Sequence, residues 1–409
     1  MLKSGVVVIH MNLNKNNQDI EYLVGNSSIK VIPQEPYNSL SCEFLNDLSI
    51  SLRNHRQIRE FPDVMAFAFW CRNSNINKLR KEFKDNKNRL GLGMVFHIAP
   101  SNVPVNFAFS FVFGLLSGNT NIVRVPSKLF SQVYIICNEI NKILENKKYS
   151  VIKAMTSFIK YERSDEITGS YSENCNARII WGGDSTIRNI RKLPIPPRCI
   201  DIAFADRFSL SIISSDSIMN INDFELERLT EGFYNDTYLM DQNACSSPHL
   251  LIWIGANKEK AQNKFWDSLY HKVKEEYELS PVSAVDKYTL LCENSIELDN
   301  IEEFKKFDNL LYILKVNKLI DNIDKYHGKF GHFFEYDTDD INELSSIVNN
   351  KYQTLTYYGV DKSELTEVIL NNSLLGIDRI VPIGQAMDMT VIWDGYDIVK
   401  NLSRIIDVK

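Results

Sequence analysis

Several short patterns that identify common functions are missing from this sequence. It contains no G-x-G-x-x-G, no G-x-x-x-x-G-K-[ST] and no H-E-x-x-H, which excludes the usual phosphate-binding loops and the zinc-protease helix. No C-x-x-C pair occurs among its seven cysteines, and its seven histidines are not clustered with them at zinc spacing. The sequence therefore gives no reason to expect a metal site.

The sequence also has no large excess of charge of one sign and no long apolar run. The formal net charge is −6 and is spread along the chain, without the basic stripe that nucleic-acid binding requires. The longest apolar run, Phe107–Leu116, is about half as long as a bilayer span, and the run at residues 5–9 is too short for a signal peptide. Because the cysteines are odd in number and widely spaced, no disulfide framework is indicated. We expect a cytoplasmic protein without a transmembrane segment.

The length of 409 residues predicts two domains, because one hydrophobic core seldom grows beyond about 250–300 residues. Strand-like and helix-like patterns alternate along the chain, which is typical of α/β folds with parallel sheets and crossover helices. In the first block we expect strands at 94–99, 121–125 and 178–181, and helices at 104–116, 129–144 and 185–191. In the second we expect strands at 250–254, 310–314, 330–335 and 354–358, helices from 222, at 257–278 and at 339–349, and a short C-terminal helix.

One cysteine stands in the loop between an expected helix and an expected buried strand, within Asp241-Gln242-Asn243-Ala244-Cys245-Ser246-Ser247-Pro248. A thiol in such a loop can be partly exposed and can lie in the electrostatic field of a helix terminus, which favours the reactive thiolate. Most cysteines, however, are small buried hydrophobes. Position alone therefore leaves Cys245 open as a nucleophile or as an inert loop residue.

A polar loop also follows the first expected strand, where open α/β sheets place their ligands. It reads Ala99-Pro100-Ser101-Asn102-Val103-Pro104. The amide of Asn102 is a donor suited to an oxyanion. An Asn between two prolines is also a common turn residue, so this reading stays open.

Two further segments could meet a phosphate or ribose. Arg124 and Lys128, with Ser127 between them, follow the second strand and could bind such groups or simply be solvated. Gly183 and Asp184 precede a helix whose N-terminus could bind a phosphate, although Asp184 could also serve only as its cap.

The order of these motifs resembles the aldehyde dehydrogenase superfamily. The resembling block runs from Gly93 to Lys128 as strand, Pro-x-Asn-x-Pro, helix, Gly-Asn-Thr, strand and Pro-Ser. The Gly-rich turn before a helix and the nucleophile of that superfamily are similar to Gly182-Gly183-Asp184 and Cys245. Two later signatures are similar to Phe330-Gly331 and Pro382-Ile383-Gly384.

Within that superfamily the sequence is most similar to the fatty acyl-CoA reductases of bacterial bioluminescence, the LuxC type. The likeness runs from about residue 55 to the end of the chain. The stretches that carry it are residues 61–72, 242–248, 353–356 and 378–395, the last of which reads DRIVPIGQAMDMTVIWDG.

This resemblance implies an aldehyde dehydrogenase-like fold with an oligomerisation element. A Rossmann-like nicotinamide domain would comprise residues 1–220 with part of the tail at 381–409, and the catalytic domain would comprise 221–380. The thiolate of Cys245 would attack acyl-CoA or another activated acyl group, and Asn102 would hold the oxyanion. Hydride from the cofactor would then release a fatty aldehyde.

The resemblance also implies the cofactor contacts and the partners. Lys128 stands where the superfamily often has a Glu for the adenosine ribose, which favours NADPH over NADH. A homo-oligomer and an acyl-activating synthetase partner are implied. The implied cofactor-binding residues are Ala99, Pro100, Ser127, Lys128, Gly183 and Asp184.

The sequence departs from the superfamily pattern in four places. Val125 and Gly328 stand where it has a ribose-binding Lys and Glu, and Phe204 stands near the position of its general-base Glu. A glycine-bearing turn expected at 162–170 is replaced by Glu162-Arg163-Ser164-Asp165. We therefore expect altered cofactor contacts and weak hydrolysis of the acyl-enzyme.

Three alternatives remain open at this point. A short-chain CoA-acylating aldehyde dehydrogenase would share the fold and the cysteine. A cofactor-independent cysteine acyltransferase or thioesterase would pair Cys245 with His249 or His97. A non-catalytic scaffold would keep only the fold.

Overall fold

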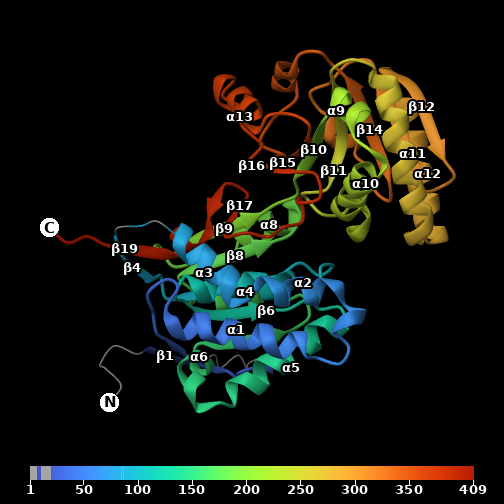
Figure 1. The fold of residues 1–409 in the computed structure, drawn as a ribbon. Helices are drawn as coiled ribbons and strands as arrows, with labels where there is room; N and C mark the ends of the chain where they lie inside the picture. The colour runs from blue at the N-terminus through green and yellow to red at the C-terminus, as the bar shows by residue number, and fades with distance from the viewer. Residues whose placement is uncertain (1–6, 11–19, 84, 86) are drawn as a thin grey trace. The chain divides into compact units, whose positions relative to one another are not determined.

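The computed structural model describes residues 7–10, 20–83, 85 and 87–409 of the chain. The chain forms two compact units (Figure 1): unit 1 comprises Met1–Ala205 and Tyr396–Lys409, and unit 2 comprises Asp206–Gly395. Of the apolar run at 5–9, residues 5 and 6 lie outside the described residues, and the rest belongs to strand β1 (Val7–His10).

Unit 1 is built on a six-stranded sheet in the order β2-β7-β6-β5-β8-β9. Its strands run parallel, except that β2 pairs antiparallel with β7 at one edge. The strands are β2 (Glu21–Val24), β5 (Met94–Ile98), β6 (Thr120–Arg124), β7 (Thr156–Lys160), β8 (Ala177–Trp181) and β9 (Ile200–Phe204). The chain runs from β5 toward β7 and then restarts on the other side of β5, which makes a topological switch point between β5 and β8.

Helices cover both faces of this sheet. Neighbouring side chains of a strand point to opposite faces. In β5, His97 hydrogen-bonds to Ser110 of helix α4 (Asn106–Leu116), whereas Phe96 packs with residues of α7 (Asp165–Glu173) and α8 (Asp184–Arg191). Helix α4 therefore covers one face, and α7 and α8 cover the other.

The longest apolar run of the sequence is helix α4, and it is apolar because other helices cover it. Phe111 contacts Phe44 of α1 (Ser39–Arg53), and Phe109 packs edge-on against Phe67 and Trp70 of α2 (Pro62–Trp70). A helix that is apolar on most faces belongs in a core of this kind.

The remaining elements of unit 1 complete its surface. Two small antiparallel pairs join β1 to β3 (Ser28–Val31) and β4 (Asn88–Gly91) to β19 (Ser403–Ile406). The other elements are η1 (Ile58–Glu60), α3 (Asn73–Glu82), α5 (Ser131–Leu144), η2 (Lys147–Tyr149), α6 (Ser150–Ala154), β18 (Tyr396–Asp397) and α14 (Ile398–Asn401).

Unit 2 holds a seven-stranded sheet in the order β12-β13-β14-β11-β10-β15-β16, parallel except for its edge strand β12. The strands are β10 (Phe208–Ser214), β11 (Pro248–Ile254), β12 (Ile301–Phe307), β13 (Leu311–Val316), β14 (His332–Asp337), β15 (Tyr352–Tyr358) and β16 (Arg379–Pro382). The other elements are α9 (Ser215–Asn220), α10 (Asp223–Thr237), η3 (Tyr238–Met240), α11 (Lys258–Glu276), α12 (Pro281–Glu297), η4 (Ile323–Tyr326), η5 (Ile341–Ser346), α13 (Lys362–Asn371) and β17 (Ile392–Trp393).

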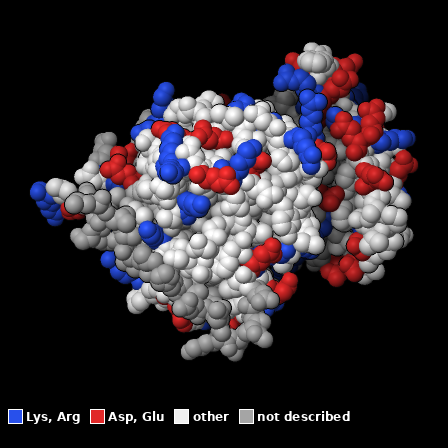
Figure 2. All heavy atoms as spheres, turned by 90° about the horizontal axis from the view of Figure 1, so that it is seen from below, with Lys and Arg blue, Asp and Glu red and all other residues white. Residues whose placement is uncertain are grey.

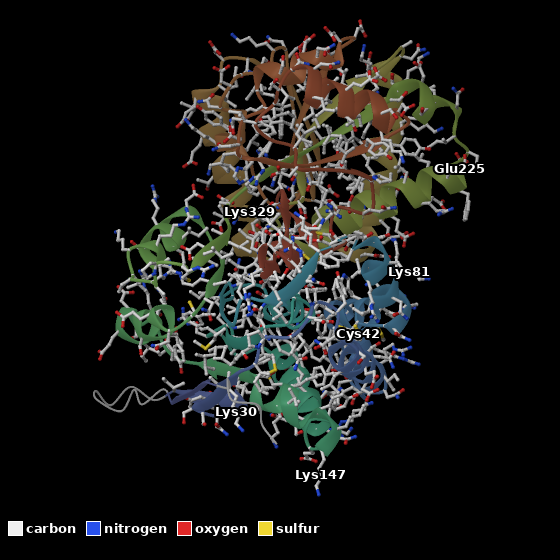
Figure 3. All side chains as sticks on the ribbon, turned by 90° about the vertical axis from the view of Figure 1, so that its left-hand side faces the viewer. Lys30, Cys42, Lys81, Lys147, Glu225 and Lys329 are labelled. Carbon is white, nitrogen blue, oxygen red and sulfur yellow. The ribbon has the colours of Figure 1, made fainter. Side chains whose placement is uncertain are left out.

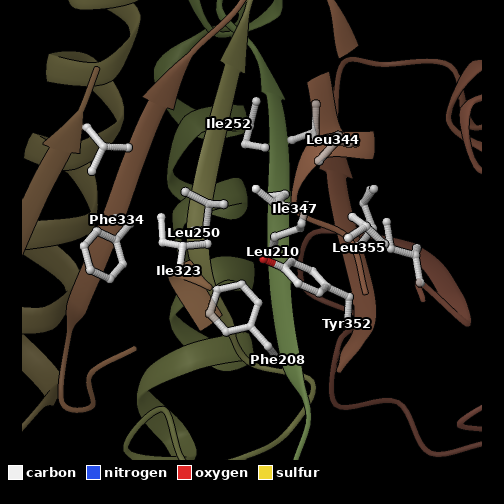
Figure 4. Close-up of a cluster of buried hydrophobic side chains, with 14 of the residues drawn as sticks. Phe208, Leu210, Leu250, Ile252, Ile323, Phe334, Leu344, Ile347, Tyr352 and Leu355 are labelled. Carbon is white, nitrogen blue, oxygen red and sulfur yellow. The ribbon is translucent and has the colours of Figure 1, made fainter. Parts of the chain in front are cut away.

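Each face of the unit 2 sheet has its own core, which explains why its central strands are apolar throughout. Leu250 and Ile252 belong to the cluster on one face, drawn in Figure 4 with Phe208 and Tyr352. Leu251 and Trp253, the residues in alternate register, belong to the cluster on the other face. Both faces of the strand are buried, as is usual in parallel sheets.

The domain limits lie elsewhere than the sequence suggests. The chain enters unit 2 after Ala205 rather than near residue 220, because β10 pairs with β11 and β15 in the second sheet. It returns to unit 1 after Gly395 rather than near 381, because β16 pairs with β15.

Two helices expected from the sequence also differ from the elements that the structure shows. The helix expected at 339–349 is the shorter 3-10 helix η5. The expectation that the chain ends in a helix is wrong, because β19 follows the single turn of α14 and pairs with β4.

The surface carries charges of both signs on the face that Figure 2 shows. On the face shown in Figure 2, Lys and Arg are interspersed with Asp and Glu. In Figure 3, Lys81 and Lys147 of unit 1 reach outward, whereas Cys42 on α1 is buried. Among the described residues, no helix is both long and apolar enough to cross a membrane.

The contact of α4 with the sheet depends on a glycine. A Cβ at Gly114 would overlap the amide oxygen of Asn121 and lie 2.9 Å from ring atoms of His97. We expect Gly114→Ala to lower the free energy of unfolding by roughly 2 kcal/mol. The matched control is Gly169→Ala on α7, where the added Cβ meets only Leu193 at 4.0 Å, so it should be neutral or stabilising by up to about 1 kcal/mol. Denaturant unfolding measures both, and equal losses would contradict this packing.

Candidate active site

Cys245 lies in unit 2, in the loop between η3 and the first residue of β11. Two consecutive residues of this loop, Asp241 and Gln242, adopt left-handed backbone conformations with φ of 53° and 59°. Such conformations are disfavoured for residues other than glycine and persist where surrounding contacts hold them. The loop is therefore fixed by its neighbours rather than by its own preference.

The side chain of Gln242 supplies most of that fixation. Its amide nitrogen donates to the carbonyls of Pro248 at 3.2 Å and His332 at 3.1 Å, and its amide oxygen accepts from the N–H groups of Gly331 at 3.0 Å and His332 at 3.1 Å. The side chain is buried, so these four bonds are shielded from water. Gln242 thereby ties the Cys245 loop to the starts of β11 and β14.

Asp236, a buried residue of α10, fixes the other side of the loop through its backbone and the turn at Gly384 through its carboxylate. Ser247 donates to the backbone carbonyl of Asp236 on α10 at 2.7 Å. The Asp236 carboxylate accepts from the N–H groups of Gly384 at 2.6 Å and Ala386 at 2.9 Å, while burial raises its pKa to about 7. Gly384 and Gly232 of α10 are close enough that a Cβ on either would press on the other's backbone. The glycine of the Pro382-Ile383-Gly384 signature thus lets the turn after β16 pack directly on α10.

The sulfur of Cys245 is half-buried in an environment that keeps it protonated. Burial, with smaller contributions from the carboxylates of Asp394 and Asp206, raises the pKa of the Cys245 thiol to about 11. The backbone N–H of Arg207 hydrogen-bonds to the sulfur and favours the thiolate, but this effect is smaller. The expectation that the loop position favours thiolate is therefore wrong for this environment, because desolvation outweighs the available donors.

Sequence reasoning missed Arg207, whose side chain fastens the segment beside Cys245. Its guanidinium donates to the carbonyls of Lys351 at 3.1 Å and Tyr352 at 2.6 Å and to the carboxylate of Asp378 at 2.6 Å, and it lies 3.6 Å from that of Asp394. Asp378 and Asp394 stand near the two ends of the stretch 378–395, so Arg207 holds these two ends close to each other.

Two more contacts complete this network. Gln353 donates to Asp394, and Ser209 donates to the carbonyl of Cys245 at 2.6 Å. The stretches 353–356 and 378–395, singled out in the sequence, are thus joined to the Cys245 loop through Arg207, Gln353 and Ser209. Spacing along the chain carries no signal for such contacts.

In unit 1, the candidate cofactor residues gather at one edge of the sheet. The loop with Ala99, Pro100 and Asn102 follows β5, Ser127 and Lys128 follow β6, and Gly183 and Asp184 follow β8. These three strands are neighbours and parallel, so their carboxyl ends lie at the same edge, at the switch point of the sheet. Asn102 and Lys128 are exposed there.

The turn after β8 leaves room for a ligand group. Gly183 is the N-cap of α8 without a capping side chain, and Asp184 is the first helical residue rather than the cap. A Cβ at Gly183 would meet nothing within 4 Å. Uncapped N–H groups at a helix N-terminus favour a phosphate or carboxylate.

The departures from the superfamily pattern have clear structural settings. Val125 is buried, and the guanidinium of Arg124 lies over the ring of Tyr161 at 4.4 Å and donates to its carbonyl at 3.4 Å. Phe204 stacks on Trp181 with ring centroids 3.8 Å apart, and Tyr396 meets it edge-on. Phe204, which the resemblance places near the general-base Glu of the superfamily, is thus part of an aromatic stack.

Neither candidate histidine is set up as a base for Cys245. His97 lies in the core of unit 1, and both its ring nitrogens are engaged, with Ser110 at 2.8 Å and Asn121 at 3.0 Å. His249 packs on Phe208 in unit 2, and burial lowers its pKa well below the usual value. Among the described residues, no group of three or more His, Cys, Asp or Glu is placed to hold a metal ion.

Comparison with known proteins identifies the family. The family model of LuxC acyl-CoA reductases matches residues 55–310, more than half of the chain. The chain belongs to this family. It is accordingly an oxidoreductase that reduces acyl groups to aldehydes. Among curated proteins, none matches the sequence.

Solved aldehyde dehydrogenases share the fold of this LuxC-family chain. A salicylaldehyde dehydrogenase from Pseudomonas putida G7 complexed with salicylaldehyde gives a TM-score of 0.62 at 14% identity, covering 90% of this chain and 84% of that chain. A NAD-dependent benzaldehyde dehydrogenase from Corynebacterium glutamicum gives 0.59 at 12% identity, with 90% and 85% covered. A lactaldehyde dehydrogenase from Escherichia coli gives 0.59 at 12% identity, with 89% and 85% covered. The expected aldehyde dehydrogenase-like fold is confirmed.

The role of Gln242 can be tested in this LuxC-family chain without an activity assay. Gln242→Leu keeps the side-chain bulk but removes four buried hydrogen bonds to backbone N–H and carbonyl groups. We expect the free energy of unfolding to fall by at least about 3 kcal/mol. Asn243→Leu is the matched control, because Asn243 is exposed and bonds only within its own loop, so its change should stay within about 0.5 kcal/mol. Similar losses in both variants would refute the role given to Gln242.

Proposed function

We propose that this protein reduces fatty acyl-CoA, or another activated fatty acyl group, to the fatty aldehyde, with NADPH as hydride donor and Cys245 as covalent nucleophile. The observation that carries the proposal is the setting of Cys245 in a chain of the acyl-CoA reductase family. Its sulfur is half-buried, hydrogen-bonded to the Arg207 N–H, and held in a loop clamped by Gln242 and Asp236.

The chemistry starts with the thiol. The sulfur attacks the acyl carbonyl, and its proton is lost before or during that attack, since only the thiolate is strongly nucleophilic. The amide of Asn102 and the backbone N–H of Cys245 are the donors proposed for the oxyanion, whose collapse expels the acyl carrier, which leaves as a thiol in the case of CoA. A thioester between the acyl group and Cys245 remains.

A nicotinamide cofactor fits the polar edge of the unit 1 sheet. The support is the switch point between β5 and β8, the open N-cap at Gly183, and the exposed loops after β5 and β6. When bound there, the cofactor would supply hydride to the thioester carbonyl. Ala99, Pro100, Ser127, Gly183 and Asp184 would hold it. We assign NADPH because Lys128 offers an exposed ammonium for a 2′-phosphate, while Arg124 is engaged with Tyr161.

The direction of reaction follows from the residue at the base position. The aromatic stack of Phe204 with Trp181 supplies no group that could activate water. The acyl-enzyme is therefore expected to react with hydride, or with a thiol in reverse, much faster than with water.

Among the alternatives, a short-chain CoA-acylating aldehyde dehydrogenase would use the same residues, and only a series of acyl chain lengths separates it. A cofactor-independent acyltransferase or thioesterase is disfavoured by the settings of His97 and His249. The family likeness supports two further parts of the proposal, an acyl-activating synthetase that supplies the acyl group and a homo-oligomeric state.

The covalent step is tested with labelled acyl-CoA in the absence of cofactor. We expect the label on Cys245 and none in Cys245→Ala, while Cys292→Ala, which removes an exposed cysteine, labels normally. Asn102→Ala should acylate roughly 10²-fold more slowly, because it loses one oxyanion donor. Peptide mass spectrometry locates the label. A label on another cysteine, or full reductase activity in Cys245→Ala, would overturn the assignment.

The cofactor preference is tested at Lys128. Lys128→Glu replaces the ammonium with a carboxylate that repels a 2′-phosphate, so the ratio of kcat/KM for NADPH over NADH should fall by roughly tenfold or more. Lys153→Glu is the control, because it makes the same charge change on α6, at the amino end of β7 and away from the candidate edge. An unchanged ratio in Lys128→Glu would remove Lys128 from the cofactor site.

The lack of hydrolysis is tested in the oxidative direction. With a long-chain aldehyde and NADP⁺, we expect turnover to stop near one equivalent of enzyme without CoA and to continue with CoA, because the loss of a general base typically costs 10²–10⁴-fold. Absorbance of the reduced cofactor gives the turnover. Sustained release of free acid without CoA would show that water is activated, and the reductase assignment would give way to ordinary aldehyde oxidation.

A further inference from the structure

Two cysteines outside the candidate active site lie in direct contact in unit 1. The sulfurs of Cys175 and Cys199 are 3.6 Å apart. Cys175 stands between α7 and β8, and Cys199 stands just before β9. Because β8 and β9 are parallel neighbours, with Ala177 opposite Ile200, both cysteines lie at the amino ends of adjacent strands. This is the edge of the sheet opposite to the candidate cofactor residues.

The backbone around the two sulfurs is firmly held. The guanidinium of Arg178 on β8 forms two hydrogen bonds with the carboxylate of Asp201 on β9, at 2.7 and 2.8 Å. Arg178 is 1% exposed and also donates to the carbonyl of Ile190 on α8 at 3.0 Å. A paired, buried arginine of this kind fixes the spacing of β8 and β9, and with it the spacing of the cysteines.

The two thiols differ in access and in charge. Cys175 is buried and donates to the carbonyl of Ser172 at 3.2 Å, whereas Cys199 is half-exposed. The hydrogen bond between the two sulfurs, in which either thiol can be the donor, lowers the pKa of Cys199, and the same contact, together with burial, raises the pKa of Cys175. The half-exposed Cys199 is thus the better nucleophile, and the buried Cys175 lies in contact with it.

We propose that Cys199 and Cys175 form a reversible disulfide on exposure to hydroperoxides, with Cys199 as the attacking thiol and Cys175 as the resolving thiol. The Cys199 thiolate attacks the peroxide O–O bond; with hydrogen peroxide, one proton is taken up, water leaves and Cys199 becomes a sulfenic acid. The Cys175 thiol then attacks that sulfur, the S–O bond breaks, and a second water leaves with the Cys175 proton. A small-molecule dithiol restores both thiols, taking the disulfide form itself.

The other cysteines show why the pair is distinctive. Cys71 and Cys137 are buried, and burial raises the pKa of each thiol, so peroxide should leave them unmodified. Cys292 is exposed and can be oxidised, so its serine variant serves as a control. The proposal does not depend on the function assigned to Cys245.

The test uses the full-length Cys245→Ala protein, so that oxidation of the proposed nucleophile does not interfere. Treatment with hydrogen peroxide should remove two hydrogens from the protein mass, and proteolysis without reductant should yield one peptide pair joined through Cys175 and Cys199. Dithiothreitol should reverse both changes. The absence of this crosslink, or a crosslink between other cysteines, would overturn the proposal.

The order of attack is tested with dimedone, which traps sulfenic acids. In Cys175→Ser we expect the label on Cys199, because the resolving thiol is missing. In Cys199→Ser we expect Cys175 to stay unlabelled. Cys292→Ser is the matched control and should still form the 175–199 crosslink. Equal labelling of Cys175 in Cys199→Ser would refute the assigned roles. The disulfide itself is tested separately, by the crosslink in the Cys245→Ala protein, which requires neither serine variant.

Discussion

The geometry of unit 2 around the candidate nucleophile depends on the hydrogen bonds of one amide side chain. Gln242 uses both its donor and its acceptor groups on backbone atoms of β11 and β14 and of the turn before β14. A cysteine three residues later in an irregular loop would otherwise sample many positions. Because the amide is buried, each bond is hard to exchange for water, and the loop keeps a backbone conformation that its residues do not prefer.

A protonated thiol at rest is consistent with an enzyme that must avoid side reactions. Desolvation is the dominant cause of the high pKa, and two carboxylates add to it. A neutral thiol reacts slowly with stray electrophiles and oxidants, because the thiolate is the nucleophilic form. The Arg207 N–H already donates a hydrogen bond to the sulfur and would stabilise a negative charge on it. Any change that brings further hydrogen-bond donors to the sulfur would therefore lower the pKa of the thiol.

Local patterns in the sequence were sufficient to predict most of the fold. Strands β5, β6, β8 and β11 lie within two residues of the predicted limits, because their apolar runs reflect burial on both faces. The motif positions that follow β5, β6 and β8 meet at one edge because these strands are parallel neighbours. Arg207 was not predictable, since its carboxylate partner Asp378 lies 171 positions further along the chain. The raised pKa of the Cys245 thiol could not be read from the sequence, because burial is a property of the folded chain.

The division of the chain has a consequence for its synthesis. Unit 2 is continuous in sequence, whereas unit 1 is completed only by the final residues 396–409. Those residues are integral to unit 1, because β19 pairs with β4, Tyr396 contacts Phe204, and the carbonyl of Leu402 accepts from Asn119. Unit 1, whose first segment is synthesised before unit 2, is therefore the last to finish folding, and a chain that stops before residue 403 would leave β4 without its partner strand.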